Sequence, residues 1–187
     1  MTAGPMQALP PARDRRIVMH GLLRSVGVAT FLMALYCVAP LHELAKSPIW
    51  VSLSGGLLVL AAVTVYEVRA TLDADYPRLR AIEALATTIP LFLVMFAANY
   101  FVMAQNSSAN FNVHTLSRTS AFYFTVSTFS TVGYGDITAA SQTARVLVMV
   151  QIALGLIILG LGIRVFISAV QTAAQERAAE GTRERQL

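Results

Sequence analysis

Four long apolar stretches constrain the fold of this chain more than any other feature. They run from about Leu22 to Leu41, from Ile49 to Val68, from Ala84 to Met103 and from about Val146 to Ser168. Each is close to the roughly 20 residues that an α-helix needs to cross a bilayer. The chain is 56% hydrophobic and only 13% charged, which departs from the composition of soluble domains. The sequence therefore predicts an all-α membrane protein with four transmembrane helices.

The basic residues predict which side of the membrane each loop faces. With both termini in the cytoplasm, eleven Lys and Arg residues lie inside, and only Lys46, Arg118 and Arg145 lie outside. Cytoplasmic loops carry such an excess of positive charge. We therefore expect a multi-pass protein of the cell membrane with both termini cytoplasmic. The alternative is a signal peptide around Arg15 and Arg16, but no clear small-residue cleavage site follows the first apolar stretch.

A polar segment and a short helical segment separate the third and fourth apolar stretches. Residues 119–130, TSAFYFTVSTFS, are too few to span a bilayer and are rich in hydroxyl and aromatic side chains. This composition suits a re-entrant helix surrounded by protein, where non-helical backbone is tolerated at membrane depth. The segment leads directly into TVGYGD, residues 131–136.

The TVGYGD string predicts a loop that binds a dehydrated cation. A column of carbonyl oxygens directed at one axis requires left-handed and right-handed backbone conformations in alternation. Glycine enters the left-handed region without a Cβ penalty, and Gly133 and Gly135 are placed to allow it. Thr131 adds a hydroxyl oxygen, while Val132 and Tyr134 can pack outward. A turn in a β-protein is the alternative, which the flanking apolar segments disfavour.

From about Ile82 to Val170 the chain resembles the pore domain of the potassium-channel superfamily. The shared order is outer helix, polar turret, short re-entrant helix, TVGYGD and inner helix, and TVGYG is that family's selectivity-filter sequence. The resemblance implies K⁺ as the transported ion and no cofactor. The ion would be bound by the carbonyls of Thr131, Val132, Gly133 and Tyr134, with Gly135 completing the filter. It also implies a channel, and no nucleophile–base or metal-ligand set in the sequence suggests an enzyme.

The resemblance extends to residues beside the filter. The family's pore helix corresponds to a segment that includes Ser127 and Thr128, and its aromatic cuff around the filter corresponds to Tyr123 and Phe124. Asp136 resembles the acidic residue that helps to hold the outer mouth and attract cations. A hydrogen-bonding role behind the filter is the other interpretation of Asp136.

The fourth apolar stretch contains candidate gating residues. Gly155 lies where similar channels place a hinge glycine, and Gly160 lies where many have a second small residue. Close helix packing is the alternative for such glycines, and it is the favoured one for Gly162. Gln151 either lines a cavity or bonds a neighbouring helix, and the sequence does not choose. Arg164 is expected near the cytoplasmic mouth, at the membrane interface or as part of an inner gate.

One filter strand cannot surround an ion, and the chain contains one GYG-like string. A single pore loop per chain therefore implies a homotetramer, a closed ring of like contacts. The tandem-pore family also has four spans, but it carries two pore loops per chain and does not match.

The predicted organisation has four parts. These are a cytoplasmic N-terminal tail (1–16), a peripheral two-helix region (17–80), a pore domain (81–170) and a cytoplasmic C-terminal tail (171–187), which is helix-prone as far as Gly181. Arg13, Arg16, His20 and Arg24 share one face of a helix, and the three arginines are expected to contact anionic lipid headgroups. The net charge of +4 is explained by membrane topology rather than by nucleic-acid binding.

The leading functional hypothesis is a potassium-selective channel gated by inner-helix movement. It would have neither a voltage-sensor helix nor a large cytoplasmic ligand-binding domain. Three alternatives remain: a weakly selective cation channel, a subunit of a K⁺ transporter with degenerate pore loops, and a non-conducting regulatory subunit. The intact filter string argues against the first two, and only flux measurements separate the third.

Overall fold

The computed structural model describes residues 12–39, 49–72 and 77–184. Its elements are α1 (Ala12–Val38), α3 (Ile49–Leu72), α4 (Pro77–Asn106), η1 (Ser108–Asn110), α5 (Arg118–Phe129) and α6 (Gln142–Glu184). Within these ranges the β-pairing amounts to an isolated bridge between Phe111 and Ala139. The prediction of an all-α chain is therefore confirmed for the described residues.

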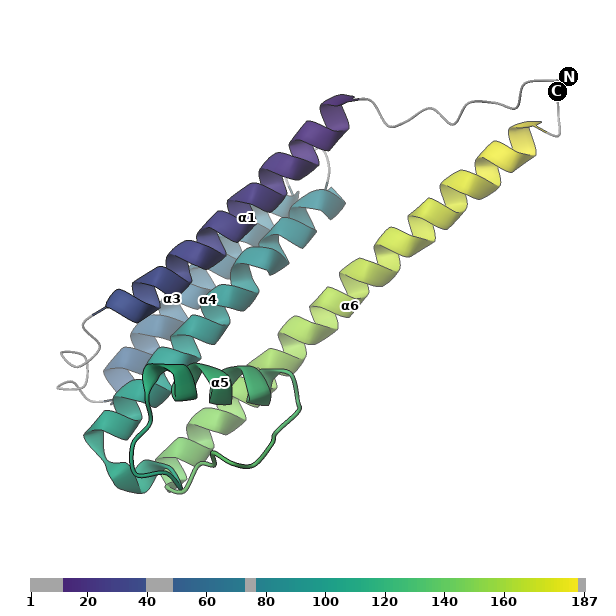
Figure 1. Cartoon of the computed structure of the whole chain (residues 1–187). Coiled ribbons are helices and arrows are strands. Elements are labelled where there is room, and N and C mark those ends of the chain that lie inside the picture. Colours follow the sequence, from purple (N-terminus) through teal and green to yellow (C-terminus); the bar gives the residue numbers. More distant parts are fainter. Residues whose placement is uncertain (1–11, 40–48, 73–76, 185–187) are drawn as a thin grey trace, which may run out of the picture.

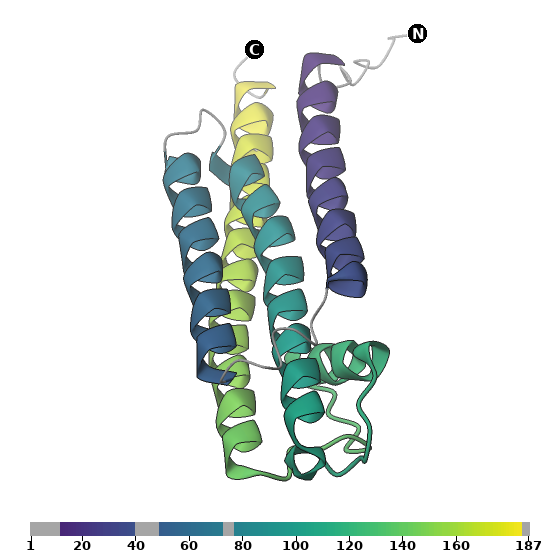
Figure 2. The same ribbon diagram turned by 90° about the vertical axis from the view of Figure 1, so that its left-hand side faces the viewer.

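Helix α4 is the centre of the fold. It packs against α1, α3, α5 and α6, and Figure 1 shows α5 running across the direction of the long helices. The start of α1 and the end of α6 lie at one end of the molecule, and α5 lies toward the other end (Figure 2). Much of the core comes from α4 itself, with Phe92, Phe96 and Tyr100 fully buried.

Among the described residues, two helices have the length and composition of a membrane span. They are Arg80–Asn106 in α4 and Gln142–Val165 in α6, with mean hydropathies of 1.9 and 2.7. The apolar parts of α1 and α3 within the described residues are shorter, Leu23–Val38 and Leu53–Glu67. The predicted first segment is helical as far as Val38, and the second is helical throughout. Their crossing of the membrane stays a prediction.

The short helix before TVGYGD forms where the sequence predicts it. Helix α5 covers Arg118–Phe129 and is capped by the Ser117 hydroxyl, which accepts a hydrogen bond from the Ser120 N–H. At the other end of the chain, α6 continues through Gly181 to Glu184. The expected end of helical structure at Gly181 is therefore wrong, because one glycine weakens a helix by only about 1 kcal/mol.

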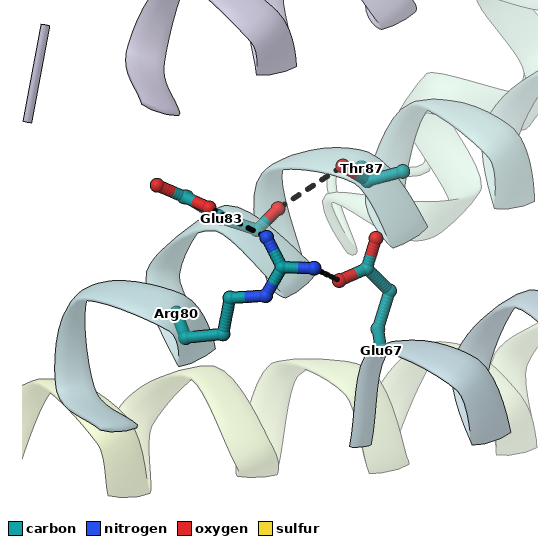
Figure 3. A network of polar contacts seen from close by, with 4 residues as sticks. All are labelled: Glu67, Arg80, Glu83 and Thr87. Carbon is teal, nitrogen blue, oxygen red and sulfur yellow. Dashed lines mark hydrogen bonds and ion pairs between the residues drawn. The ribbon is translucent and has the colours of Figure 1, made fainter. Parts of the chain in front are cut away.

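An ion-pair cluster joins α3 to the start of α4. The Arg80 guanidinium lies between two carboxylates, 3.5 Å from Glu67 Oε2 on α3 and 3.0 Å from Glu83 Oε2 on its own helix (Figure 3). Glu67 is only 5% exposed, and a buried carboxylate needs a charged or hydrogen-bonding partner. Arg80 supplies that partner at the end of the molecule opposite α5.

Helix α3 approaches α4 most closely at Gly56. A Cβ atom at this position would lie 2.7 Å from Met95 Cγ and 3.0 Å from Met95 Sδ, whereas a Cβ at the adjacent Gly55 would meet nothing within 4 Å. The absence of a side chain at Gly56 is therefore what lets the two helices touch.

We expect Gly56→Ala to lower the free energy of unfolding by about 1–3 kcal/mol relative to Gly55→Ala, the usual cost of overpacking. Both substitutions change helix propensity by the same amount, so the difference isolates the contact with Met95. Equilibrium unfolding of the purified protein in a denaturing detergent measures it. Equal stabilities of the two variants would contradict the close approach.

Candidate functional site

The TVGYGD loop alternates between two backbone conformations. Thr131, Gly133 and Gly135 have positive φ angles of 61°, 56° and 80°, and the residues between them do not. The sequence predicts this conformation for the two glycines. It gives no such signal for Thr131, because a residue with a Cβ atom enters the left-handed region at a cost of about 1–2 kcal/mol.

The C-terminal end of α5 holds the inner part of this loop. The Ser127 carbonyl oxygen accepts hydrogen bonds from the backbone N–H groups of Val132 at 3.1 Å and Gly133 at 3.3 Å, and Thr131 donates to the Thr128 carbonyl at 3.2 Å. The last carbonyls of a helix lack partners within it, so the loop satisfies them by folding back. These bonds stabilise the unusual conformation of Thr131.

Tyr123 of α5 supports the outer part of the loop. Its ring stacks on the ring of Tyr134, with centroids 6.0 Å apart and planes 12° from parallel. Asp136, two residues after Tyr134, is exposed. Both interpretations of its carboxylate, at the outer mouth and behind the filter, stay predictions.

The two aromatic residues predicted to form a cuff face different surroundings. Phe124 is buried against Tyr100 and Phe111 of the same chain, with ring centroids 5.0 and 5.8 Å away. Consecutive residues point about 100° apart around a helix. Only Tyr123 of the pair is therefore directed at the loop, and Phe124 belongs to the core of the single chain.

Asn112, which the sequence does not single out, holds the segment after the loop. Its side-chain amide donates to the Asp136 carbonyl at 2.9 Å, and its side-chain oxygen accepts from the Thr138 N–H at 2.7 Å. Its own N–H donates to the Thr138 carbonyl at 3.1 Å. A polar residue in a polar segment carries no sequence signal for such a role.

Gln151 links three helices. It is 1% exposed. It accepts a hydrogen bond from the Tyr100 hydroxyl of α4 at 2.5 Å and donates one to the Thr125 carbonyl of α5 at 2.9 Å. The structure thus selects between the two interpretations: Gln151 bonds neighbouring helices rather than lining a cavity.

The two predicted hinge glycines have different surroundings in a continuous helix. A Cβ atom at Gly155 would lie 3.3 Å from Phe129 Cδ2, whereas one at Gly160 would meet nothing within 4 Å. Gly155 therefore allows α6 to pack closely on the end of α5. A Cβ atom at Gly162 would lie 3.9 Å from Leu85 Cδ1, an ordinary van der Waals distance.

Of the three arginines predicted to contact lipid, the structure describes the side chain of one. The side chains of Arg13 and Arg16 lie outside the described residues, and Arg24 is exposed on α1. Arg164 is also exposed, on α6. In the described part of the chain, no three His, Cys, Asp or Glu side chains gather as metal ligands. The backbone oxygens of residues 131–134 stay the predicted cation ligands.

Comparisons with known proteins identify the same region. A family model described as "Ion channel" matches residues 88–172. A 39-residue segment is 49% identical to "Two-pore potassium channel 4" of Arabidopsis thaliana, covering 21% of this chain and 14% of the relative. No solved structure is a significant match to the chain. The matched family points to a channel and not to an enzyme.

We expect the Tyr100 and Gln151 side chains to be energetically coupled. Tyr100→Phe removes the donor, and Gln151→Leu leaves both the hydroxyl and the Thr125 carbonyl without their partner, at a cost of about 1–3 kcal/mol. A double-mutant cycle on the free energy of unfolding should give a coupling of about 1 kcal/mol. Strict additivity of the two substitutions would contradict the link.

Proposed function

We propose that this chain is a member of the potassium-channel superfamily and forms a potassium-selective channel that conducts passively as a homotetramer, which the partial matches to an ion-channel family and to a potassium channel support. One observation carries the proposal: the left-handed conformation recurs at residues 131, 133 and 135, in a loop anchored to the end of α5. The match of residues 88–172 to an ion-channel family supports a place among ion channels. The proposed choice of K⁺ depends on this loop.

The backbone alternation has a direct chemical consequence. In a strand that alternates left-handed and right-handed residues, successive carbonyls can point to one side instead of to opposite sides. Four such oxygens, from Thr131 to Tyr134, would form a ladder of cation ligands in each chain, extended at its inner end by the Thr131 hydroxyl. Oxygens in this arrangement replace the hydration shell of K⁺, and repulsion between ions in file drives conduction.

The exposure of two apolar loop residues in the single chain supports assembly into a homotetramer. Val132 and Tyr134 are 55% and 71% exposed, although they belong to a loop between two apolar helices. Irregular backbone is tolerated at membrane depth only where protein or a water-filled cavity surrounds it. Three further copies around one axis would enclose the loops and place four carbonyls at each level of the ladder.

The proposed orientation follows from the helix ends. The loop would face outward, because the end of the molecule opposite α5 carries Arg69, Arg80 and the start of α1. A positively charged end of this kind faces the cytoplasm. Both termini would then be cytoplasmic in the cell membrane, and α1 and α3 would form the peripheral region, with anionic lipid near Arg13, Arg16 and Arg24.

Reversal potentials in planar bilayers test the selectivity. With K⁺ on one side and a tenfold lower K⁺ concentration on the other, Na⁺ replacing it, the current should reverse close to the K⁺ equilibrium value of about 59 mV. A reversal near zero would favour the weakly selective channel. Absence of current from the assembled homomer would favour the non-conducting subunit.

We expect Gly133→Ala to abolish K⁺ selectivity, because its φ of +56° is strained for alanine by about 1–2 kcal/mol and the carbonyl ladder would rotate. Gly27→Ala is the matched control, since a Cβ atom at Gly27 of α1 meets nothing within 4 Å. Retained selectivity in Gly133→Ala would contradict the role of the left-handed residues.

Gating is proposed to involve bending of α6 at Gly155 or Gly160. Gly160→Ala separates bending from packing, because the added methyl group meets nothing within 4 Å. Alanine stiffens the helix by up to about 1 kcal/mol, so the ratio of open to closed time should fall about fivefold. Single-channel recording measures that ratio, and an unchanged value would remove Gly160 as a hinge.

A further inference from the structure

A single arginine joins the end of α1 to the beginning of α5. Arg118 donates hydrogen bonds from Nη1 to the carbonyls of Tyr36 and Cys37, both at 2.6 Å, and from Nη2 to the carbonyl of Ala39 at 2.7 Å. These carbonyls belong to the last turn of α1 and the residue after it. Arg118 is the first residue of α5, about 80 positions away in the sequence.

The contact is reciprocal. The Tyr36 hydroxyl donates a hydrogen bond to the Arg118 carbonyl at 2.7 Å, and Tyr36 is 3% exposed. The Tyr36 ring also lies 6.1 Å from the ring of Phe122, one turn further along α5. The Arg118 guanidinium lies over the Phe101 ring of α4, 5.4 Å from its centroid. Hydrogen bonds to α1 therefore fix both the side chain and the backbone of Arg118.

The physics of a helix end explains why this contact is strong. The last four carbonyls of a helix have no partner within the helix, and they carry the negative pole of its dipole. A guanidinium placed there forms charge-assisted hydrogen bonds, which are about twice as strong as neutral ones. The rigid fork of arginine can reach several carbonyls at once, which an ammonium cannot do in the same way.

Helix α5 connects this contact to the loop. Its twelve residues span roughly 18 Å at 1.5 Å per residue. At its other end, the Ser127 carbonyl accepts from Val132 and Gly133, and Tyr123 in its middle stacks on Tyr134. A shift or tilt of the Arg118 end therefore moves the groups that support the loop.

We propose that α1 positions the TVGYGD loop through Arg118 and Tyr36. The two residues are positioning residues: they do not touch the ion, and they act by fixing the N-terminal end of α5. This inference rests on the proposed function, because it assigns a partner helix to the same ion-binding loop. It gives the peripheral helix α1 a defined role in ion binding.

The test measures how K⁺ stabilises the purified, assembled protein. Thermal unfolding is followed while K⁺ replaces Na⁺ at constant ionic strength. A ligand that binds only the folded state stabilises it by RT ln(1 + [L]/Kd), so the dependence of the midpoint on K⁺ concentration gives Kd, the half-saturating concentration. The wild-type protein should be stabilised by K⁺ over Na⁺, with a measurable half-saturating K⁺ concentration.

The variants are expected to shift that half-saturating concentration. Tyr36→Phe keeps the ring and removes one hydrogen bond, so the concentration should rise about threefold. Arg118→Met removes the charge-assisted bonds, and the concentration should rise about tenfold. Arg118→Lys keeps the charge without the fork and should fall between the wild type and Arg118→Met.

Matched controls come from α3. Tyr66→Phe and Arg69→Met make the same chemical changes at exposed positions, and both should leave the half-saturating concentration unchanged. A merely structural role for Tyr36 and Arg118 would lower the unfolding temperature equally at every K⁺ concentration. That result would overturn the positioning role. If Arg118→Met does not assemble, the half-saturating K⁺ concentrations of Tyr36→Phe and Arg118→Lys test the positioning role instead.

Different results would contradict the proposed function and the positioning role of Arg118 and Tyr36. A wild-type protein that K⁺ does not stabilise over Na⁺ would contradict the proposed function, and the positioning role with it. A wild-type protein that K⁺ does stabilise, combined with unshifted Tyr36→Phe and Arg118→Lys, would overturn only the positioning role.

Discussion

The hydrogen bonds from Val132 and Gly133 to the Ser127 carbonyl are the contacts on which the candidate site depends. They join an irregular loop to the end of a helix, and they stabilise Thr131 in a conformation that a residue with a side chain seldom adopts. They fix the orientation of the peptide groups at the inner end of the loop. The position of α5 therefore decides the geometry of the loop, and the rest of the chain can be understood by how it holds α5.

Three other helices hold α5. Arg118 attaches its N-terminal end to α1, and Gln151 joins its middle to α6 and, through Tyr100, to α4. At its C-terminal end Phe129 lies against Phe92 of α4 and against Gly155 of α6. A short helix alone in a membrane would have neither a fixed tilt nor a fixed depth. These polar and aromatic contacts supply both, so the peripheral helix α1 becomes part of the support of the loop.

The fold was largely predictable, because hydropathy and glycine placement are local properties. Residues 119–130 predicted α5 almost to its ends, and Gly133 and Gly135 predicted their own conformations. Contacts between distant residues left no such signal. Arg118 was counted only as one of three outer basic residues, and Asn112 was one polar residue among many. Gln151 could not be assigned before its partners Tyr100 and Thr125 were placed. Thr131 takes a left-handed conformation only because the end of α5 holds it there.

We propose that the carbonyls of residues 131–134 from four chains form a ladder of cation ligands. Crystals of the assembled protein grown with thallium(I), a K⁺ substitute with a strong anomalous signal, test it most directly. We expect a file of anomalous peaks on a fourfold axis, with the peaks surrounded by backbone oxygens of Thr131, Val132, Gly133 and Tyr134. An axis without peaks, or carbonyls turned away from it, would rule out this ladder.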